Sequence, residues 1–315
     1  MSAARVAVLG SINIDIAVRA PRIPEPGETL HGHGAALSLG GKGANQAVAA
    51  RKLGGDVAFI GLTGEDGFAA LAREALERHG VSLAYVGTVP GSTGIATISI
   101  DDAGQNAILV VAGANGAVSP ARVRAAREAL AGARVLLLQC ETPQPAAIAA
   151  ARIVKAAGGL VILDPAPVPS AGLDPDLIGL TDIVTPNESE ARLLTGIDVV
   201  DEASAHRAAS ALCAQGFAAA IVKLGGRGLV WRQGDAYGVV PPLNVNVVDT
   251  VAAGDSFNGG LAIALAETES LPQALTFAAA CGAVAVTRAG AAEAAPTRSE
   301  VESLLLASRN DSANR

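Results

Sequence analysis

The sequence predicts an α/β protein in which helices cover both faces of a mostly parallel β-sheet, with a small second β-sheet beside it. The main observation is an alternation along the chain, because short apolar runs are separated by longer stretches with helical periodicity. This pattern is typical of a parallel sheet in a three-layer αβα arrangement. Two further segments lack helical periodicity and contain alternating polar and apolar residues, which indicates strands outside the main sheet.

The short apolar runs are the expected parallel strands. They cover residues 6–10, 57–60, 135–139, 160–163, 183–185 and 220–224. Between and around them, residues 44–53, 68–79, 120–130, 145–157, 188–194 and 203–215 have the pattern of helices. Ligands of open α/β sheets bind at the carboxyl ends of the strands, so we expect the functional site at that edge.

The two segments without helical periodicity cover residues 12–39 and 93–111. The second contains the alternating run TISI at 97–100, and DDAG at 101–104 then reads as a hairpin turn. We expect the two segments to pair as a small sheet that acts as a lid over substrate. Residues 1–308 then form a single domain with the lid segments inserted, and residues 309–315 form a frayed tail.

The composition argues against several classes of function. The formal net charge of −7 disfavours a nucleic acid or an anionic membrane as partner, and an aromatic content of 3% is low for stacking on bases. The three cysteines lie far apart, which fits reduced thiols rather than disulfides or a zinc site. The sequence shows neither a signal-peptide pattern nor an apolar stretch long enough to span a bilayer. We therefore expect a cytoplasmic protein.

The strongest local signal is the stretch VDTVAAGDSFNGG at residues 248–260. A turn of small residues, Ala252, Ala253 and Gly254, comes directly before Asp255 and an apolar helical run. Free N–H groups and the helix dipole at such a turn favour an anion such as a phosphate. An acid at this place fits a base that accepts a proton from a hydroxyl attacking a phosphoryl group. The alternative is an ordinary helix N-terminus with a favourable acid in its first turn.

Two polar groupings near the N-terminus have the composition of a polyol site. Asn13 and Asp15, in GSINID, share one face of an extended chain and could hold two hydroxyls, the alternative being a strand-end cap. The stretch LGGKGANQAVAA at 39–50 allows close backbone approach through its glycines, and it places Lys42 and Asn45 near a helix start. It does not match the phosphate-binding loop GxxxxGK[ST]. The first strand lacks a following GxGxxG, which disfavours a dinucleotide-binding oxidoreductase.

Three more groups follow predicted strands. Glu141 comes just after the strand at 135–139. Asn187 and Glu190, in TPNESE, could hold a hydrated Mg²⁺ and a phosphate oxygen, or they could cap a helix. The run KLGGRG at 223–228 could wrap around a nucleotide or form only a turn.

Taken together, four ordered motifs resemble the ribokinase branch of the sugar-and-nucleoside kinase family over nearly the whole chain. They are GSINID, GGKGANQAVAA, TPNESEA with KLGGRG, and DTVAAGDSFNGG, and the second is the most specific to this branch. The resemblance implies transfer of the γ-phosphoryl group of ATP to the 5-hydroxyl of ribose. It also implies a central sheet with a small β-sheet lid, which in such kinases often pairs with the lid of a second subunit to form a homodimer.

The resemblance assigns roles to the residues at matching positions. Asp255 matches the catalytic base, and the backbone of Ala252, Ala253 and Gly254 matches the anion hole. Glu190 would help to organise Mg²⁺ through water. The sugar-binding positions are Asn13, Asp15, Gly41, Lys42, Asn45, Glu141 and Asp255. The nucleotide positions are Asn187, Lys223, Gly225, Gly226, Gly228 and Gly254. An activating K⁺ beside the anion hole would be held, mostly through backbone carbonyls, by Asp249, Val251, Ala285, Arg288, Gly290 and Ala294.

Three positions depart from the pattern of better-known ribokinases, and none of them removes a residue that the chemistry needs. Ala294 stands where a serine is familiar, Ala279 where a histidine often flanks the adenine, and Asp164 where an asparagine is familiar.

The sequence also leaves other functions open. One is a kinase for another small sugar, such as 2-deoxyribose, or for a nucleoside, although few aromatic residues are available to hold a base. Another is a catalytically silent sugar-sensing protein on the same fold, which the intact Gly254 and Asp255 disfavour.

Overall fold

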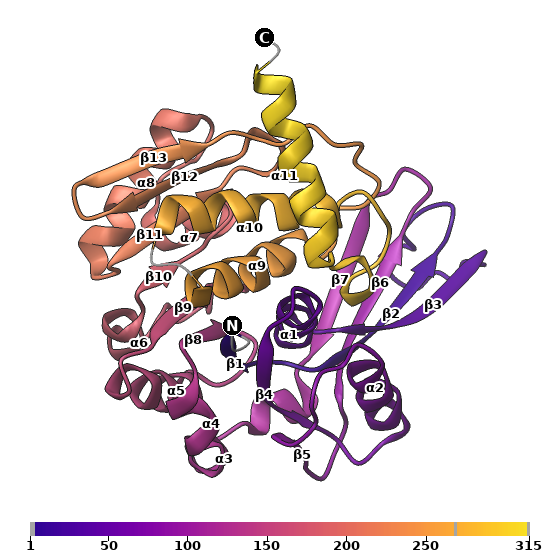
Figure 1. The fold of residues 1–315 in the computed structure, drawn as a ribbon. Coiled ribbons are helices and arrows are strands. Elements are labelled where there is room, and N and C mark those ends of the chain that lie inside the picture. Colours follow the sequence, from indigo (N-terminus) through magenta and orange to yellow (C-terminus); the bar gives the residue numbers. More distant parts are fainter. Residues whose placement is uncertain (1–3, 268–269, 314–315) are drawn as a thin grey trace.

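A nine-stranded β-sheet forms the centre of the molecule (Figure 1) in the computed structural model, which describes residues 4–267 and 270–313. The strand order is β13-β12-β11-β10-β9-β8-β1-β4-β5. Neighbouring strands from β11 to β5 run parallel, whereas β12 and β13 add an antiparallel hairpin at one edge. The strands are β1 (Arg5–Leu9), β4 (Asp56–Thr63), β5 (Val86–Thr88), β8 (Val135–Gln139), β9 (Leu160–Asp164), β10 (Ile183–Val184), β11 (Ala219–Lys223), β12 (Leu229–Gln233) and β13 (Ala236–Val240).

The six predicted parallel strands are confirmed as β1, β4, β8, β9, β10 and β11. Sequence reasoning missed β5 and the β12–β13 hairpin. The hairpin lies at the sheet edge, and much of β13 is exposed, with Tyr237 64% exposed. An edge strand of this kind lacks the continuous apolar run by which the inner strands are recognised.

Helices cover both faces of this sheet and confirm the predicted three-layer architecture. The predicted helix at 120–130 is divided into α3 and α4 at Ala126, while α6 and α11 were not predicted. Residues 309–313 of the predicted tail continue α11, and residues 314–315 lie outside the described part of the chain. The helices are α1 (Lys42–Lys52), α2 (Gly67–Arg78), α3 (Pro120–Ala125), α4 (Arg127–Gly132), α5 (Gln144–Ala156), α6 (Pro175–Leu180), α7 (Glu188–Thr195), α8 (Glu202–Gln215), α9 (Ala253–Glu267), α10 (Leu271–Ala285) and α11 (Arg298–Ala313).

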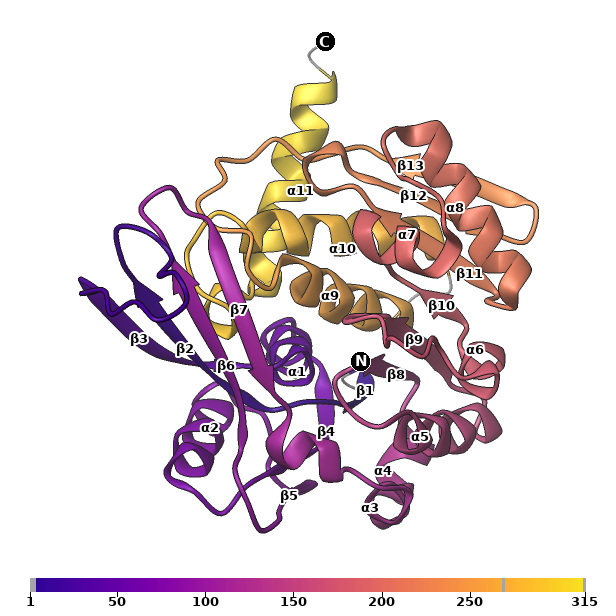
Figure 2. The ribbon, with the colours of Figure 1, turned by 180° about the vertical axis from the view of Figure 1, so that it is seen from behind.

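The residues of the inner strands alternate between two hydrophobic cores, one on each face of the sheet. In β1, Val6 and Val8 belong to the core beneath α1, α9 and α10, whereas Ala7 and Leu9 belong to the core beneath α3, α4, α5 and α8. Figures 1 and 2 show these two sets of helices on opposite faces. Because successive side chains of a strand point to opposite faces, a strand buried on both faces must be apolar throughout.

The segments predicted to form a second sheet do so, in the order β3-β2-β6-β7. The strands are β2 (Asn13–Arg19), β3 (Gly34–Gly40), β6 (Gly94–Ile100) and β7 (Asn106–Val111). The small sheet is mixed, because β2 pairs parallel to β6 and antiparallel to β3. The predicted turn at 101–104 joins β6 to β7, and a hydrogen bond from Gly104 N to Asp101 O closes it. Figure 2 shows this sheet projecting from the main body.

No helix within the described ranges combines the length and the apolar character that crossing a membrane requires.

Candidate active site

Most predicted site residues meet at the carboxyl ends of the central strands, where the helices α1 and α9 begin. The small sheet contributes Asn13 and Asp15 from the start of β2. Asn13 is 3% exposed, and Asn115 Nδ2 donates to its Oδ1 at 2.8 Å. Asn115 also accepts from Ile12 N and donates to Ile12 O, so its amide is fixed against the backbone. Asn115 therefore orients Asn13, and nothing in the local sequence pattern identified it.

Asp15 lies across the end of β3. A Cβ added at Gly40 would come within 2.0 Å of Asp15 Oδ1, so the missing side chain at Gly40 leaves the room that this carboxylate occupies. The pKa of Asp15 is raised to about 6, mainly by burial and in addition by the negative charges of Glu141, Asp255 and Glu293. The carboxylates at this end of the sheet are thus close enough to influence one another.

The N-terminus of α1 is built by close backbone approach. Gly41 has φ +87, a conformation that residues with a side chain rarely adopt, and it turns the chain from β3 into α1. A Cβ at Gly43 would lie 2.5 Å from Ser11 N, which explains the glycine-rich sequence. Ser11 Oγ accepts from Gly43 N and donates to Glu141 Oε2, which also accepts from Lys42 N at 2.9 Å. Ser11 is a second residue that sequence reasoning missed.

Asp255 lies in the first turn of α9, which follows directly from an unusual turn. Ala252 has φ +55 and is the one non-glycine residue with positive φ in the described ranges. Such a conformation costs roughly 1–3 kcal/mol and is common at functional sites. The N–H groups of Gly254 and Asp255 have no helical carbonyl one turn earlier, so they are free to bind a ligand. The strain at Ala252 therefore goes with an N-terminus that is ready to receive an anion.

The carboxylate of Asp255 is buried and held by two amides. Asn45 Nδ2 donates to Oδ2 and Gln46 Nε2 donates to Oδ1, each at 3.0 Å. The pKa of Asp255 is raised to about 6, with burial as the largest cause. Lys42 opposes the rise, Asp164 contributes to it, and the two amide donors lower the pKa. A carboxyl with a pKa near neutrality suits a general base.

Lys42 is half-buried among carboxylates. Burial lowers its pKa, but Asp255, Asp164 and Glu141 together with Glu190 outweigh that effect, so the pKa lies above its ordinary value. Lys42 therefore keeps its positive charge beside Asp255. Asn45 presents a further polar group, because its Oδ1 is buried and has no hydrogen-bond partner within the protein. An oxygen of this kind is available to accept from a ligand hydroxyl.

The structure adds a buried polar chain between α1, β8, β9 and β11. Gln139 Nε2 donates to Gln46 Oε1 at 2.6 Å, and Gln46 Nε2 donates to Asp164 Oδ2 at 3.1 Å as well as to Asp255. Lys223 Nζ lies 3.3 Å from Asp164 Oδ1. Sequence reasoning gave Gln46 and Gln139 no role, although Gln46 stands directly after Asn45 in the GGKGANQA motif.

The residues predicted to hold a nucleotide lie around β10 and β11. Asn187 and Glu190 form a complete capping box at the start of α7, so the predicted cap exists. Burial and then Asp164 raise the pKa of Glu190. Gly225 and Gly226 are exposed, and a Cβ on either would meet nothing within 4 Å. Gly228 has φ +86 and approaches Val240 O closely, which fixes the exit of the loop.

Lys223 and Gly254 connect this predicted nucleotide region with Asp255. A Cβ at Gly254 would lie 3.4 Å from Lys223 Nζ. The same ammonium group lies 5.9 Å from the centre of the Phe257 ring. The predicted nucleotide loop and the predicted catalytic turn are therefore adjacent in space.

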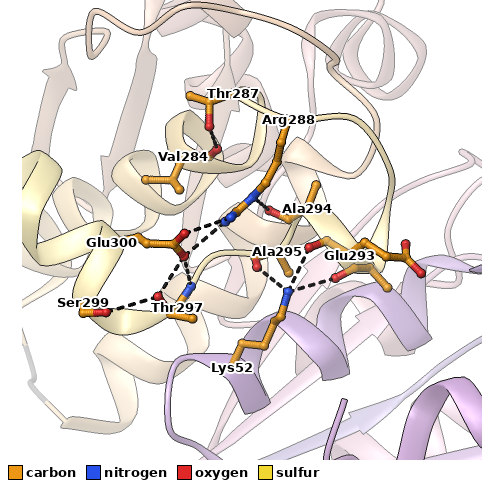
Figure 3. A network of polar contacts seen from close by, with 11 residues as sticks. Lys52, Val284, Thr287, Arg288, Glu293, Ala294, Ala295, Thr297, Ser299 and Glu300 are labelled. Carbon is orange, nitrogen blue, oxygen red and sulfur yellow. Dashed lines mark hydrogen bonds and ion pairs between the residues drawn. The ribbon is translucent and has the colours of Figure 1, made fainter. Parts of the chain in front are cut away.

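The six residues predicted to hold a monovalent cation also come together. Asp249 accepts from Val251 N and Gly290 N, and Arg288 donates to Ala285 O and Ala294 O. Figure 3 shows that the guanidinium of Arg288 also pairs with Glu300. The oxygen donors here, one carboxylate and several carbonyls, have the hard character that K⁺ requires.

Lys52, at the other end of α1, holds the chain beside this cation region. Its Nζ donates to Ala295 O at 2.7 Å and Glu293 O at 2.9 Å, with a longer contact to Ala292 O at 3.5 Å (Figure 3). These carbonyls belong to the short 3₁₀ helix η3 (Ala292–Ala294) and the residue after it. Within the described ranges, no three side chains of His, Cys, Asp or Glu gather as metal ligands. A cation here would depend on the single carboxylate of Asp249 together with carbonyls and water.

The fold and the site together define a carbohydrate kinase. Residues 3–298 match the pfkB family of carbohydrate kinases, and the chain belongs to that family. Among curated relatives, a ribokinase of Haemophilus influenzae is 41% identical over 295 residues, which cover 93% of this chain and 95% of that protein. A deoxyribokinase of Salmonella typhi is 35% identical, with 93% of this chain and 95% of that protein covered.

A solved structure supports the same relationship. The structure of Arabidopsis thaliana ribokinase complexed with ribose and ATP superposes with a TM-score of 0.88 and 35% sequence identity. The alignment covers 96% of this chain and 99% of that one. The similarity therefore extends over the main sheet and the small sheet alike.

Proposed function

We propose that this chain transfers the γ-phosphoryl group of ATP to the 5-hydroxyl of D-ribose, giving ribose 5-phosphate and ADP. The observation that carries the proposal is Asp255, a buried carboxylate with a raised pKa in the first turn of α9. The polar side chains of α1 and β2 surround it. Relatives named ribokinase, and the related structure that holds ribose and ATP, support the choice of substrates.

In this proposal Asp255 accepts the proton of the ribose 5-hydroxyl while the oxygen attacks phosphorus. The N–H groups at the turn formed by Ala252, Ala253 and Gly254 would bind the charge that develops on the transferred group. Lys42, which stays protonated beside Asp255, would add a positive charge. Little covalent chemistry is required of the protein in phosphoryl transfer, so position and electrostatics supply most of the catalysis.

The sugar would lie between β2, the N-terminus of α1 and the end of β8. Six residues there offer hydroxyl partners, through carboxylates, amides, an ammonium group and backbone. They are Asn13, Asp15, Gly41, Lys42, Asn45 and Glu141. The unpartnered Oδ1 of Asn45 supports a ligand at this place.

The nucleotide would lie on the other side of Asp255, along β10 and β11. We assign its contacts to Asn187, Lys223, Gly225, Gly226, Gly228 and Gly254. Mg²⁺ would neutralise phosphate charge, and Glu190 would hold it through water. The carboxylate of Glu190 already accepts from Asn187, which leaves its remaining lone pairs for water.

A potassium ion would be held by Asp249, Val251, Ala285, Arg288, Gly290 and Ala294. When bound, it would supply positive charge that orders the loops beside the anion hole. The oxygen-rich donor set fits this role. The carbonyls of Ala285 and Ala294 also accept from Arg288, so Arg288 would share these oxygens with the ion.

The small sheet is proposed to act as a lid and as the contact of a homodimer. Ile108, Leu109, Val110 and Val111 on β7 are each at least half exposed, as is Leu37 on β3. Exposed apolar patches on a sheet of this kind often mark a protein interface. The rest of residues 1–308 would form one kinase domain, acting in the cytoplasm without a nucleic acid or membrane partner.

The nearest alternative acceptor is 2-deoxyribose, because a deoxyribokinase is among the relatives. ADP release with MgATP and K⁺ should be measured across ribose, 2-deoxyribose, fructose, adenosine and uridine. Selective turnover of ribose supports the proposal. Turnover only with another acceptor keeps the mechanism and replaces the substrate, whereas folded protein that binds ribose without releasing ADP would indicate a sugar sensor.

A further inference from the structure

The amide of Gln46 contacts two buried carboxylates at once. Gln139 Nε2 donates to Gln46 Oε1, which identifies the carbonyl end of the Gln46 side chain. The NH₂ end then directs one hydrogen to Asp255 Oδ1 at 3.0 Å and the other to Asp164 Oδ2 at 3.1 Å. Both carboxylates are almost completely buried, at 5% and 3% exposed. One nitrogen therefore connects Asp164 directly with the proposed base.

We propose that Asp164 is a positioning residue for Asp255, and that it acts through the shared amide of Gln46. This inference rests on the proposed function, because it assumes that Asp255 is the base. Asp164 belongs to the carboxyl end of β9 and touches the base only through Gln46. Its other contact is Lys223 of β11, at 3.3 Å.

The negative charge of Asp164 acts on the pKa of Asp255. A second negative charge beside Asp255 disfavours ionisation of the base, and it acts with burial to hold the pKa near 6. Lys223 works against this effect, because its ammonium group neutralises much of the charge on Asp164. In this proposal the pair formed by Asp164 and Lys223 modulates the pKa of Asp255, on which burial has the largest effect.

Other charged groups also lie near Asp255 and are not changed by substitutions of the pair. Lys42 on α1 is the opposing positive charge, and Asp15 on β2 is a further negative one. Glu141 after β8 and Glu190 on α7 surround Lys42. The helix α10, which packs against α9, contains no charged residue.

Two substitutions should shift the pKa of Asp255 in opposite directions. Asp164→Asn preserves the shape and removes the negative charge, so Asp255 ionises at lower pH. Lys223→Met leaves Asp164 without its counter-ion, so Asp255 ionises at higher pH. A role of the pair in nucleotide binding alone would raise KM for ATP, but it would not move the pKa of Asp255 in opposite directions in the two variants.

The experiment measures kcat/KM for ribose at saturating MgATP, on both sides of pH 6, in the wild type and both variants. Comparison at equal pH cancels the ionisation of the substrates. We expect the acidic limb to move down by roughly one pH unit in Asp164→Asn, the scale for a nearby charge, and to move up in Lys223→Met. The inference is overturned if the acidic limbs of the variants lie at the same pH as that of the wild type, or if they move in the reverse directions.

A second measurement does not depend on turnover. Aspartate labelled with ¹³C at the carboxyl carbon gives a resonance for Asp255, which Asp255→Asn identifies by its loss. Its titration should move to lower pH in Asp164→Asn, and an unchanged titration overturns the inference whatever the substrate is. Loss of turnover in Asp255→Asn with unshifted titrations would leave the proposed function standing. Near-wild-type turnover by Asp255→Asn would contradict the assignment of the base, and with it the inference that depends on that base.

Discussion

Replacing Asp255 with asparagine removes the proposed base and changes little else in volume. Removing a general base typically lowers kcat by about 10²–10⁴-fold. At 1.36 kcal/mol for each tenfold, this corresponds to about 3–5 kcal/mol of lost transition-state stabilisation. Ribose binding should weaken much less, because Asn13, Asp15 and Asn45 remain.

The same substitution has a predictable effect on stability. Asp255 accepts from Asn45 on one oxygen and from Gln46 on the other, and an asparagine side chain has only one acceptor oxygen. One buried donor therefore faces an NH₂ group, at a cost of about 1–3 kcal/mol. The variant also loses a buried charge that destabilises the wild type above pH 6, so at neutral pH the two effects largely cancel.

The contribution of Asp255 to the free energy of unfolding depends on pH. The pKa of Asp255 is raised from 3.8 to about 6 in the folded protein, so between these values the native state binds more protons than the unfolded state. The free energy of unfolding of the wild type should therefore rise as pH falls through 6, by up to about 3 kcal/mol from this group. Asp255→Asn lacks this contribution, and the stability difference between the two proteins should widen as pH falls.

The assay combines turnover, ribose binding by calorimetry and thermal unfolding at several pH values. A folded Asp255→Asn variant with turnover within tenfold of the wild type would refute the assignment of the base. A stability difference that does not change through pH 6 would refute the raised pKa.

Three further predictions concern packing and the cation region. Gly43→Ala should unfold at a markedly lower temperature than the wild type, because its Cβ would lie 2.5 Å from Ser11 N. The control Gly226→Ala, whose Cβ meets no atom within 4 Å, should keep the wild-type melting temperature, and equal melting temperatures of the two variants would contradict the packing account. Lys52→Met should lose about 1–3 kcal/mol of stability, because its carbonyl contacts are lost. Arg152→Ala, which only breaks an exposed ion pair with Asp176, should lose under about 1 kcal/mol, and similar losses in the two variants would mean that Lys52 does not hold η3. Replacing K⁺ with Na⁺ should lower both activity and melting temperature, and equal values in the two salts would remove the proposed potassium site.

Much of the fold could be predicted from the sequence, because the inner strands must be apolar on both faces. The short apolar runs around Val6 and Val135 satisfy that requirement, and this alone was enough to predict them as strands. The small sheet was predictable for a different reason, since alternation with a period of two identifies strands with unequal faces. The β12–β13 hairpin at the sheet edge has only short apolar runs, and much of β13 is exposed, so the hairpin was missed.

The candidate site was only partly predictable. Glycines such as Gly41 and Gly43, and the turn before Asp255, appear in the sequence as motifs because close backbone approach requires those residue types. The contacts of Gln46 with Asp164 and Asp255 could not be predicted, because they depend on how α1, β9 and α9 are placed relative to one another. Ser11 and Asn115 act through contacts more than 100 residues away in sequence, and local pattern carries no trace of them.

The most direct test of the proposed function is the identity of the product made from ribose and ATP. We would incubate the protein with MgATP, K⁺ and ¹³C-labelled ribose and record the ¹³C spectrum of the product. Coupling to phosphorus at carbon 5, with release of ADP, is the predicted result. Phosphate at another carbon, or no phosphorylated ribose from folded protein, would contradict it.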